Sequence, residues 1–218
     1  PQATRHRTLR AQLLDPETGA SPARAAETLA LIAALEAHDG HTRGHSGRVL
    51  LFVDLLAEEL EIAAEDRERL RWAALLHDIG KLDVDPEVLN KHGRPDDHEW
   101  QALRRHPSVG MRLAAPIVSW LGPWRGAISE HHERWDGTGY PRGLAGTDIS
   151  LAGRITAVAD VYETLTAGRP YRDAVGPEPA RAELVRVAGT QLDPRVVRAF
   201  LAISVGRLAR VTRVVAPS

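Results

Sequence analysis

Histidines that stand beside carboxylates are the residues of this chain best suited to chemistry. His77-Asp78 ends the apolar run LLHD, and His131-His132 precedes a glycine-rich stretch. Neighbouring residues on a helix point about 100° apart, so an adjacent pair can share one centre only where the helix ends. Glycines follow both pairs and favour such an end. The spacing therefore predicts metal ligation at two helix ends.

Asp160 adds a carboxylate within an otherwise apolar helix, ITAVADVYETL. A buried carboxylate without a partner costs several kcal/mol, so it requires a cation or a full set of hydrogen-bond donors. An arginine partner is the alternative to a metal at this position. A metal satisfies Asp160 and the histidines together. The candidate ligands are His45, His77, Asp78, His106, His131, His132 and Asp160.

Seven such side chains are too many for one tetrahedral zinc ion, which indicates at least two metal ions. Asp78 is the residue that we expect to bridge them. Imidazole and carboxylate donors without thiolates suit Fe or Mn, with Zn as the next choice. The chain has no cysteine, which excludes disulfides and thiolate metal sites.

The overall charge and hydropathy narrow the class of protein. Formal net charge is −1, so nothing global recruits polymeric nucleic acid or an anionic membrane, and neither is expected as a partner. No apolar run reaches membrane-spanning length and no secretory signal is visible, so we expect a cytoplasmic location. The chain starts at Pro1 rather than Met, which leaves an upstream regulatory domain open, as it does a homodimer.

Helices must position these ligands, because the hydrophobic residues recur with a helical period. In the helix expected at about 44–60, His45, Val49 and Phe52 share one face. We expect an all-α fold, a single-domain helical bundle around a multinuclear metal centre. Further helices are expected at about 21–37, 65–77, 97–105, 107–115, 124–132, 150–167, 178–188 and 194–204, and loops at 81–95, 134–147 and 168–179.

The two ends of the chain are less regular. Residues 1–20 are expected to form a linker or a loosely attached segment, 21–206 the catalytic domain, and 207–218 a C-terminal tail. The stretch 211–215 is compatible with a short strand, but it has no partner strand.

At this point the sequence resembles the HD-GYP group of the HD phosphohydrolase superfamily, in unbroken order over about residues 25–203. LHDIGK alone is shared across the superfamily, whereas the glycine-rich GYP loop is specific to the group. The matching motifs are HTRGHSGRV (41–49), LHDIGK (76–81), RHPSVG (105–110), EHHERWDGTGYPRGLAG (130–146), ITAVADVYETLT (155–166) and RPYR (169–172).

The resemblance implies hydrolysis of cyclic di-GMP to the linear dinucleotide pGpG, and in some members onward to GMP. It implies the same seven metal ligands, with Asp78 and Lys81 as catalytic residues. By resemblance Lys81 faces the substrate phosphate, Arg169 and Arg172 approach phosphates or guanine edges, and Tyr140 belongs to the substrate-binding loop.

His41 bears on the number of metals. Members with a third metal often place a carboxylate four residues before the first ligand histidine, and here that residue is His41. Imidazole also ligates metals, but Gly44 disfavours a helix that would put His41 and His45 on one face. We therefore expect two metals, with His41 as a candidate ligand of a third, and pGpG as the main product.

The expected mechanism is attack by a metal-bridging hydroxide, held between the metal of His77 and the metal of His131-His132. Attack in line expels a ribose 3′-oxygen, and Lys81 stabilises the charge that develops on phosphate. Two alternatives stay open. One is an HD phosphohydrolase that acts on another nucleotide or a hybrid cyclic dinucleotide. The other is a non-catalytic sensor of cyclic di-GMP.

Overall fold

The computed structural model describes residues 30–35, 37–39, 44–91, 93–167 and 174–214. Its described part is helical, with two isolated β-bridges, Asp136–Ala145 and Ala188–Leu192, in place of any sheet. The expectation of an all-α fold is confirmed. Of the predicted site residues, His41, Arg169 and Arg172 lie outside the described residues.

Short helices follow one another closely, and none in the described part of the chain is both long and apolar enough to cross a bilayer. The elements are α3 (His45–Glu59), α4 (Ala64–Leu75), η2 (Ile79–Asp83), α5 (Pro86–Leu89), α6 (Asp97–Arg104), α7 (His106–Leu113), α8 (Ala115–Leu121), η3 (Gly122–Arg125), α9 (Gly126–Ser129), η4 (Gly146–Asp148), α10 (Leu151–Ala167), α11 (Pro177–Val187), α12 (Pro194–Ala202) and α13 (Val205–Val214).

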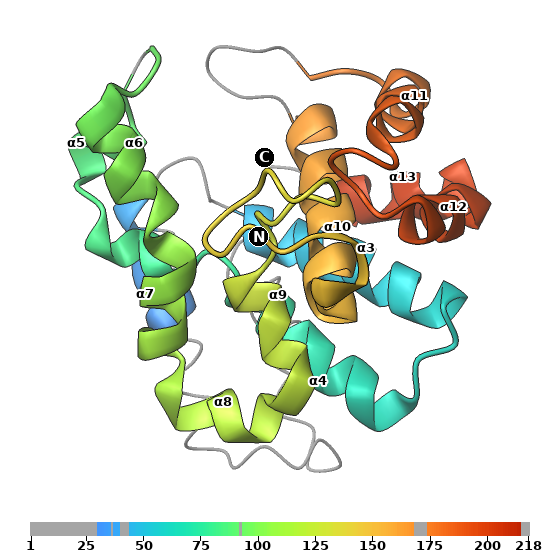
Figure 1. Ribbon diagram of the computed structural model, residues 1–218. Helices are drawn as coiled ribbons and strands as arrows, with labels where there is room; N and C mark the ends of the chain where they lie inside the picture. The colour runs from blue at the N-terminus through green and yellow to red at the C-terminus, as the bar shows by residue number, and fades with distance from the viewer. Residues whose placement is uncertain (1–29, 36, 40–43, 92, 168–173, 215–218) are drawn as a thin grey trace.

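The core is built around α10, which runs through the middle of the molecule with α3, α9 and α11 packed against it (Figure 1). Its buried face carries Tyr162, whose ring meets Phe52 of α3 at 5.1 Å and Phe200 of α12 at 4.7 Å. The predicted inner face of α3 is confirmed, because His45, Val49 and Phe52 are all buried. The close packing of α3 against α10 thus fixes the positions of the side chains on these two helices.

The two flanks of this core differ. On one side α5 and α6 form an arm that has no buried residue, although α6 begins with a capping box between Asp96 and Glu99 (Figure 1). On the other side α11, α12 and α13 close the bundle, and an ion pair between Arg207 and Glu58 ties α13 to α3. The arm is therefore held mainly through its connections to η2 and α7.

Some predicted boundaries were wrong. The stretch 211–215 is no strand: its described residues continue α13, because 205–214 have a helical apolar face. The expected loop at 81–95 contains η2 and α5, the latter started by Asp85 as N-cap and Pro86 at N1. The expected helix at 124–132 divides into η3 and α9 and already ends at Ser129. The domain boundaries stay a prediction.

Candidate metal centre

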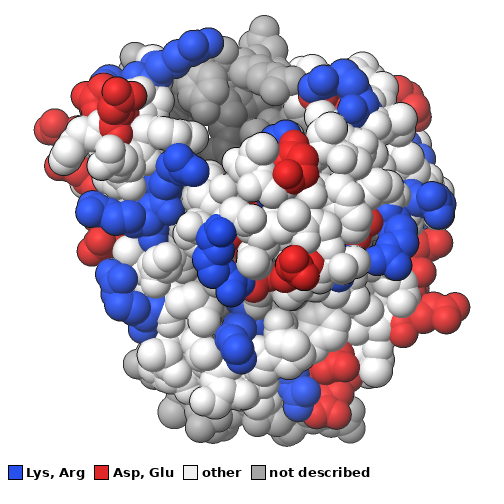
Figure 2. Space-filling view, in the orientation of Figure 1, with Lys and Arg blue, Asp and Glu red and all other residues white. Residues whose placement is uncertain are grey.

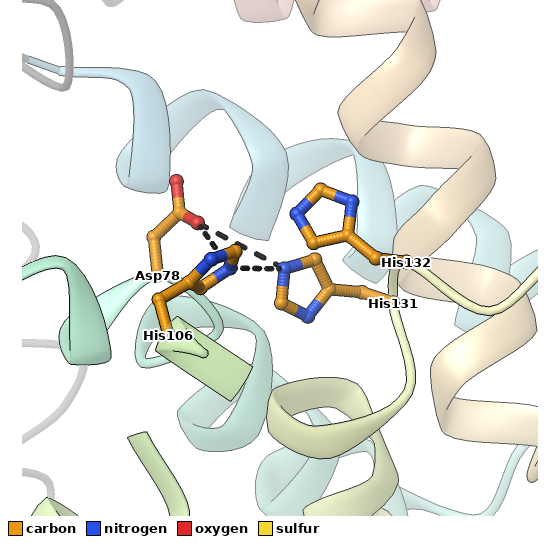
Figure 3. A group of neighbouring side chains, drawn as sticks. All are labelled: Asp78, His106, His131 and His132. Carbon is orange, nitrogen blue, oxygen red and sulfur yellow. Dashed lines mark hydrogen bonds and ion pairs between the residues drawn. The ribbon is translucent and has the colours of Figure 1, made fainter. Parts of the chain in front are cut away.

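All seven predicted ligands lie together between α3, α10, η2, α7 and the turn after α9. They form two groups, in each of which the ligating atoms lie within 4.8 Å of one another. Figure 3 shows the first, in which the side chains of His106, His131 and Asp78 converge and His132 stands beside them. The first group is Asp78, His106, His131 and His132, and the second is His45, His77 and Asp160.

Asp78 lies between the two groups and turns one oxygen to each. Its Oδ1 is 3.3 Å from Nε2 of His106 and 3.8 Å from Nε2 of His131. Its Oδ2 is 3.5 Å from Nε2 of His77 and 3.7 Å from Nε2 of His45. A carboxylate with this orientation can ligate two ions at once.

The His77-Asp78 pair converges on this centre because α4 ends at Leu75 and the chain tightens into the 3₁₀ turn η2. Gly80 in this turn packs directly on α7. A Cβ at Gly80 would lie 1.9 Å from the carbonyl oxygen of His106 and 2.6 Å from the amide nitrogen of Gly110. The absence of a side chain at Gly80 is therefore what brings His106 close to Asp78.

The His131-His132 pair follows the end of α9 and is held by the loop that comes after it. The amide of Tyr140 donates to the carbonyl oxygen of His132 at 3.2 Å. Gly139 permits this approach, since a Cβ there would lie 2.6 Å from that same carbonyl oxygen. The buried carboxylate of Glu133 accepts hydrogen bonds from the amides of Arg142 (2.7 Å) and Leu144 (3.0 Å). The loop thus folds back over the histidine pair.

Backbone carbonyls fix the rings of three histidines. Nδ1 of His77 donates to Ala74 O at 2.7 Å, and Nδ1 of His106 donates to Leu103 O at 2.7 Å. Nδ1 of His131 donates to the carbonyl oxygen three residues before it in the same way, at 3.1 Å. Since a carbonyl only accepts, the proton of each neutral ring is on Nδ1, and Nε2 presents a lone pair.

These lone pairs point at one another. Nε2 of His106 and Nε2 of His131 are 3.1 Å apart, and Nε2 of His45 and Nε2 of His77 are 3.3 Å apart. No proton is available between Nε2 of His106 and Nε2 of His131, because both rings already carry one on Nδ1, so this contact needs a shared cation. Donors about 2.0–2.2 Å from one ion have about this separation. The donor set therefore fits a divalent metal centre.

Protonation states agree with that fit. Burial lowers the pKa of His106 to about 3 and the pKa of His132 to about 4. Burial also holds the pKa of His131 well below its usual value. Burial alone would raise the pKa of Asp78, but Lys81 and the surrounding imidazoles outweigh it and hold the pKa well below the usual value. Neutral imidazoles beside an ionised carboxylate are the forms that ligate metals.

Lys81 and Tyr140, predicted to act on substrate, both border this centre. Nζ of Lys81 donates to Oδ2 of Asp78 at 2.6 Å. The ring of Tyr140 stacks on the ring of His132, with centroids 4.8 Å apart and planes inclined by 22°. The guanidinium of Arg104 lies 4.8 Å from the centroid of the Tyr140 ring. Both predicted residues are thus placed beside the ligands.

Residues that orient the candidate ligands were missed from the sequence. Glu163 is buried on α10 and accepts from Nδ1 of His45 at 2.5 Å and from Nε of Arg48 at 2.6 Å. The carboxylates of Glu130 and Glu133 flank the histidine pair and bind the loop after it. A signal was available: Glu163 lies one helical turn after Asp160, and a buried carboxylate there needs a partner as much as Asp160 does.

Comparison with known proteins is consistent with this geometry. A family model described as an HD domain matches residues 30–196, well over half of the chain. The chain belongs to the HD domain family. With His77-Asp78 in the centre and the Gly-Tyr-Pro loop at 139–141 folded over it, it is an HD-GYP member of that family.

Relatives of this HD-GYP chain include two phosphodiesterases by name. The 3′3′-cGAMP-specific phosphodiesterase 3 of Vibrio cholerae serotype O1 is 42% identical over 168 residues, which cover 76% of the chain and 36% of the relative. The cyclic di-GMP phosphodiesterase response regulator RpfG of Xanthomonas campestris pv. campestris is 39% identical, over 82% of the chain and 48% of the relative. The HD-GYP chain therefore spans between a third and a half of the length of these relatives.

Two solved structures share the fold. One is the crystal structure of a cyclic GMP-AMP-specific phosphodiesterase of V. cholerae (V-cGAP3), with a TM-score of 0.60 and 19% identity over 88% of this chain and 55% of that one. The other is Bd1817 of Bdellovibrio bacteriovorus, with a TM-score of 0.54, also at 19% identity, over 73% of this chain and 51% of that one. At this identity the likeness concerns the fold alone, and it agrees with the helical bundle described above.

Proposed function

We propose that this HD-GYP chain is the catalytic part of a two-metal phosphodiesterase that hydrolyses a cyclic dinucleotide. One observation carries the proposal: Asp78 turns Oδ1 to one group of histidines and Oδ2 to the other. A carboxylate in this position would hold two ions side by side, and pairs of metal ions stabilise the attacking and leaving oxygens in many enzymes that act on phosphate esters.

The proposed ligands of the first ion are Asp78, His106, His131 and His132, and those of the second are Asp78, His45, His77 and Asp160. When bound, two such ions neutralise charge on the phosphate and lower the pKa of water towards neutrality. Fe or Mn are the proposed metals, because the donors are imidazoles and carboxylates.

The residues of the chain have separate tasks in this proposal. Asp78 sets the spacing of the two sites, since η2 and its contact with α7 hold it in place. Lys81 is already drawn to Asp78 by charge and lies at the edge of the centre, where its ammonium group can approach a phosphate oxygen. There it stabilises the negative charge that develops as the ribose 3′-oxygen leaves.

Cyclic di-GMP is the proposed substrate and pGpG the proposed main product. The names of the relatives support a cyclic dinucleotide, and they divide between cyclic di-GMP and 3′3′-cGAMP. The intact GYP loop and the arginines at 169 and 172 favour a cyclic dinucleotide over other nucleotides, and cyclic di-GMP is the cyclic dinucleotide that the resemblance to the HD-GYP group implies.

The test is hydrolysis by protein purified without oxygen and loaded with Fe²⁺ or Mn²⁺, with the products separated by chromatography. Wild type is expected to convert cyclic di-GMP to pGpG and to bind two ions per chain. Asp78→Asn is nearly isosteric but has only one oxygen acceptor, so it should lower turnover by at least about a hundredfold and reduce the bound metal. Normal turnover by a folded Asp78→Asn variant would refute the bridged centre.

A further inference from the structure

Helix α6 has a well-formed N-terminus, but none of its side chains packs into the hydrophobic core. Its N-terminus is closed by a capping box, yet none of its residues is buried. Trp100 on this helix is 47% exposed, which is unusual for the largest apolar side chain. Arg104 stands four residues later and therefore one turn along the same face. The face thus presents an aromatic ring and a guanidinium to solvent.

This face is connected to the metal centre by a series of stacked groups. The Arg104 guanidinium lies over the ring of Tyr140, and that ring stacks on the ligand candidate His132. Lys and Arg side chains gather over α6 and α7 in Figure 2, on the side towards the loop before α10. A phosphodiester held at the metal centre would therefore have its attached nucleoside within reach of α6.

We propose that this face of α6 is the subsite for one guanine base of the cyclic dinucleotide, with Trp100 as its stacking surface and Arg104 as the residue that reads it. The inference rests on the proposed function. An arginine presents paired N–H donors that match O6 and N7 of guanine. Adenine has a donor in place of O6 and leaves one of them unmatched. A tryptophan ring stacks on any base.

The stacking role of Trp100 and the base-reading role of Arg104 can be distinguished by comparing two cyclic dinucleotides. Inhibition constants are measured for cyclic di-GMP and for cyclic di-AMP, both as inhibitors of bis(p-nitrophenyl) phosphate hydrolysis by the Mn²⁺-loaded protein. Wild type should bind cyclic di-GMP more tightly. Arg104→Ala should reduce this preference by about tenfold, because alanine offers no donor to O6 and N7. Arg104→Lys should keep part of the preference, because an ammonium group can still donate to these two acceptors but lacks the fixed paired geometry of the guanidinium.

Trp100→Ala should weaken both dinucleotides alike, by about tenfold, and leave their ratio unchanged, because stacking is indifferent to the base. Arg112→Ala is the matched control: it removes one exposed arginine from the adjoining helix α7 and should change neither constant.

Two results would overturn the subsite. One is equal affinity of the wild type for the two dinucleotides. The other is an Arg104→Ala variant that retains the full preference for cyclic di-GMP. A failure of the proposed function is distinguishable from both, because a wild type that hydrolyses neither bis(p-nitrophenyl) phosphate nor cyclic di-GMP would refute the phosphodiesterase itself.

Discussion

The two groups of candidate ligands are built in opposite ways. His106 and His131 of the first group stand at the beginning or beyond the end of short helices, and backbone carbonyls orient their rings. In the second group His45 is a buried residue on the long helix α3, and a side chain, Glu163, orients it. His77 combines both patterns, since it belongs to the second group but its Nδ1 donates to the backbone carbonyl of Ala74.

This difference teaches where each group is vulnerable. A carbonyl cannot be removed by substitution, so the first group depends on backbone packing, above all at Gly80. The second depends on one carboxylate, which Arg48 in turn holds in place through Oε1. A carboxylate partner also makes an imidazole a stronger ligand than a carbonyl does. Backbone changes should therefore damage the first group, and side-chain changes the second.

Gly80→Ala should have the largest effect. Its Cβ would overlap the carbonyl oxygen of His106, so α7 must move away from η2. We expect a loss of about 3 kcal/mol in unfolding free energy and, in protein that still folds, loss of metal at the first group. Urea unfolding and metal analysis measure the two. Gly47→Ala is the control, since a Cβ there has nothing within 4 Å; equal damage by both variants would contradict the packing argument.

Glu163→Gln should act on the second group. The amide still fills the space but no longer offers a charged acceptor to Nδ1 of His45, so metal affinity should fall by about 10–100-fold at one of the two sites. Bound Mn²⁺ is measured as a function of added Mn²⁺. The affinity of one class of sites should fall, and the affinity of the other class should stay as in wild type. Glu58→Gln, at an exposed ion pair of α3, is the control. Equal weakening of both classes would mean that the two groups are not separable.

Glu133→Gln tests the loop that covers the first group. The two carboxylate oxygens of Glu133 accept from the backbone amides of Arg142 and Leu144. In the glutamine variant an NH₂ group replaces one of these oxygens, and it cannot accept the hydrogen bond. We expect a loss of about 1–3 kcal/mol and faster tryptic cleavage after Arg142, with both metals retained. Unchanged cleavage would show that the loop is held by other contacts.

His41→Ala should have the smallest effect. With two metals the products should match those of wild type, pGpG foremost, and the metal content should stay at two ions per chain. Chromatography of the products and elemental analysis measure this. Loss of GMP formation in the variant would contradict this expectation. It would indicate a third metal site at His41, next to the second group of candidate ligands.

Much of the candidate site could be predicted from the sequence, because the signals for its residues are local. An adjacent pair of candidate ligands such as His77-Asp78 indicates a helix end. A carboxylate within the apolar face of 155–165 indicates that a cation or hydrogen-bond donors must lie beside it. The helical period likewise predicted α3 and α10, since both bury one continuous face. Boundaries failed where short helices adjoin, as at Gly126, because period alone cannot separate a 3₁₀ turn from the helix that follows it.

What only the tertiary structure decided is how these local parts meet. The division of seven ligands into two groups, and the position of Asp78 between them, depend on contacts between residues up to 115 positions apart, from His45 to Asp160. The same is true of Glu163 against His45 and of Arg104 over Tyr140. A side chain's type and period determine which face of its helix it occupies, but the partner on that face is chosen by how the helices pack.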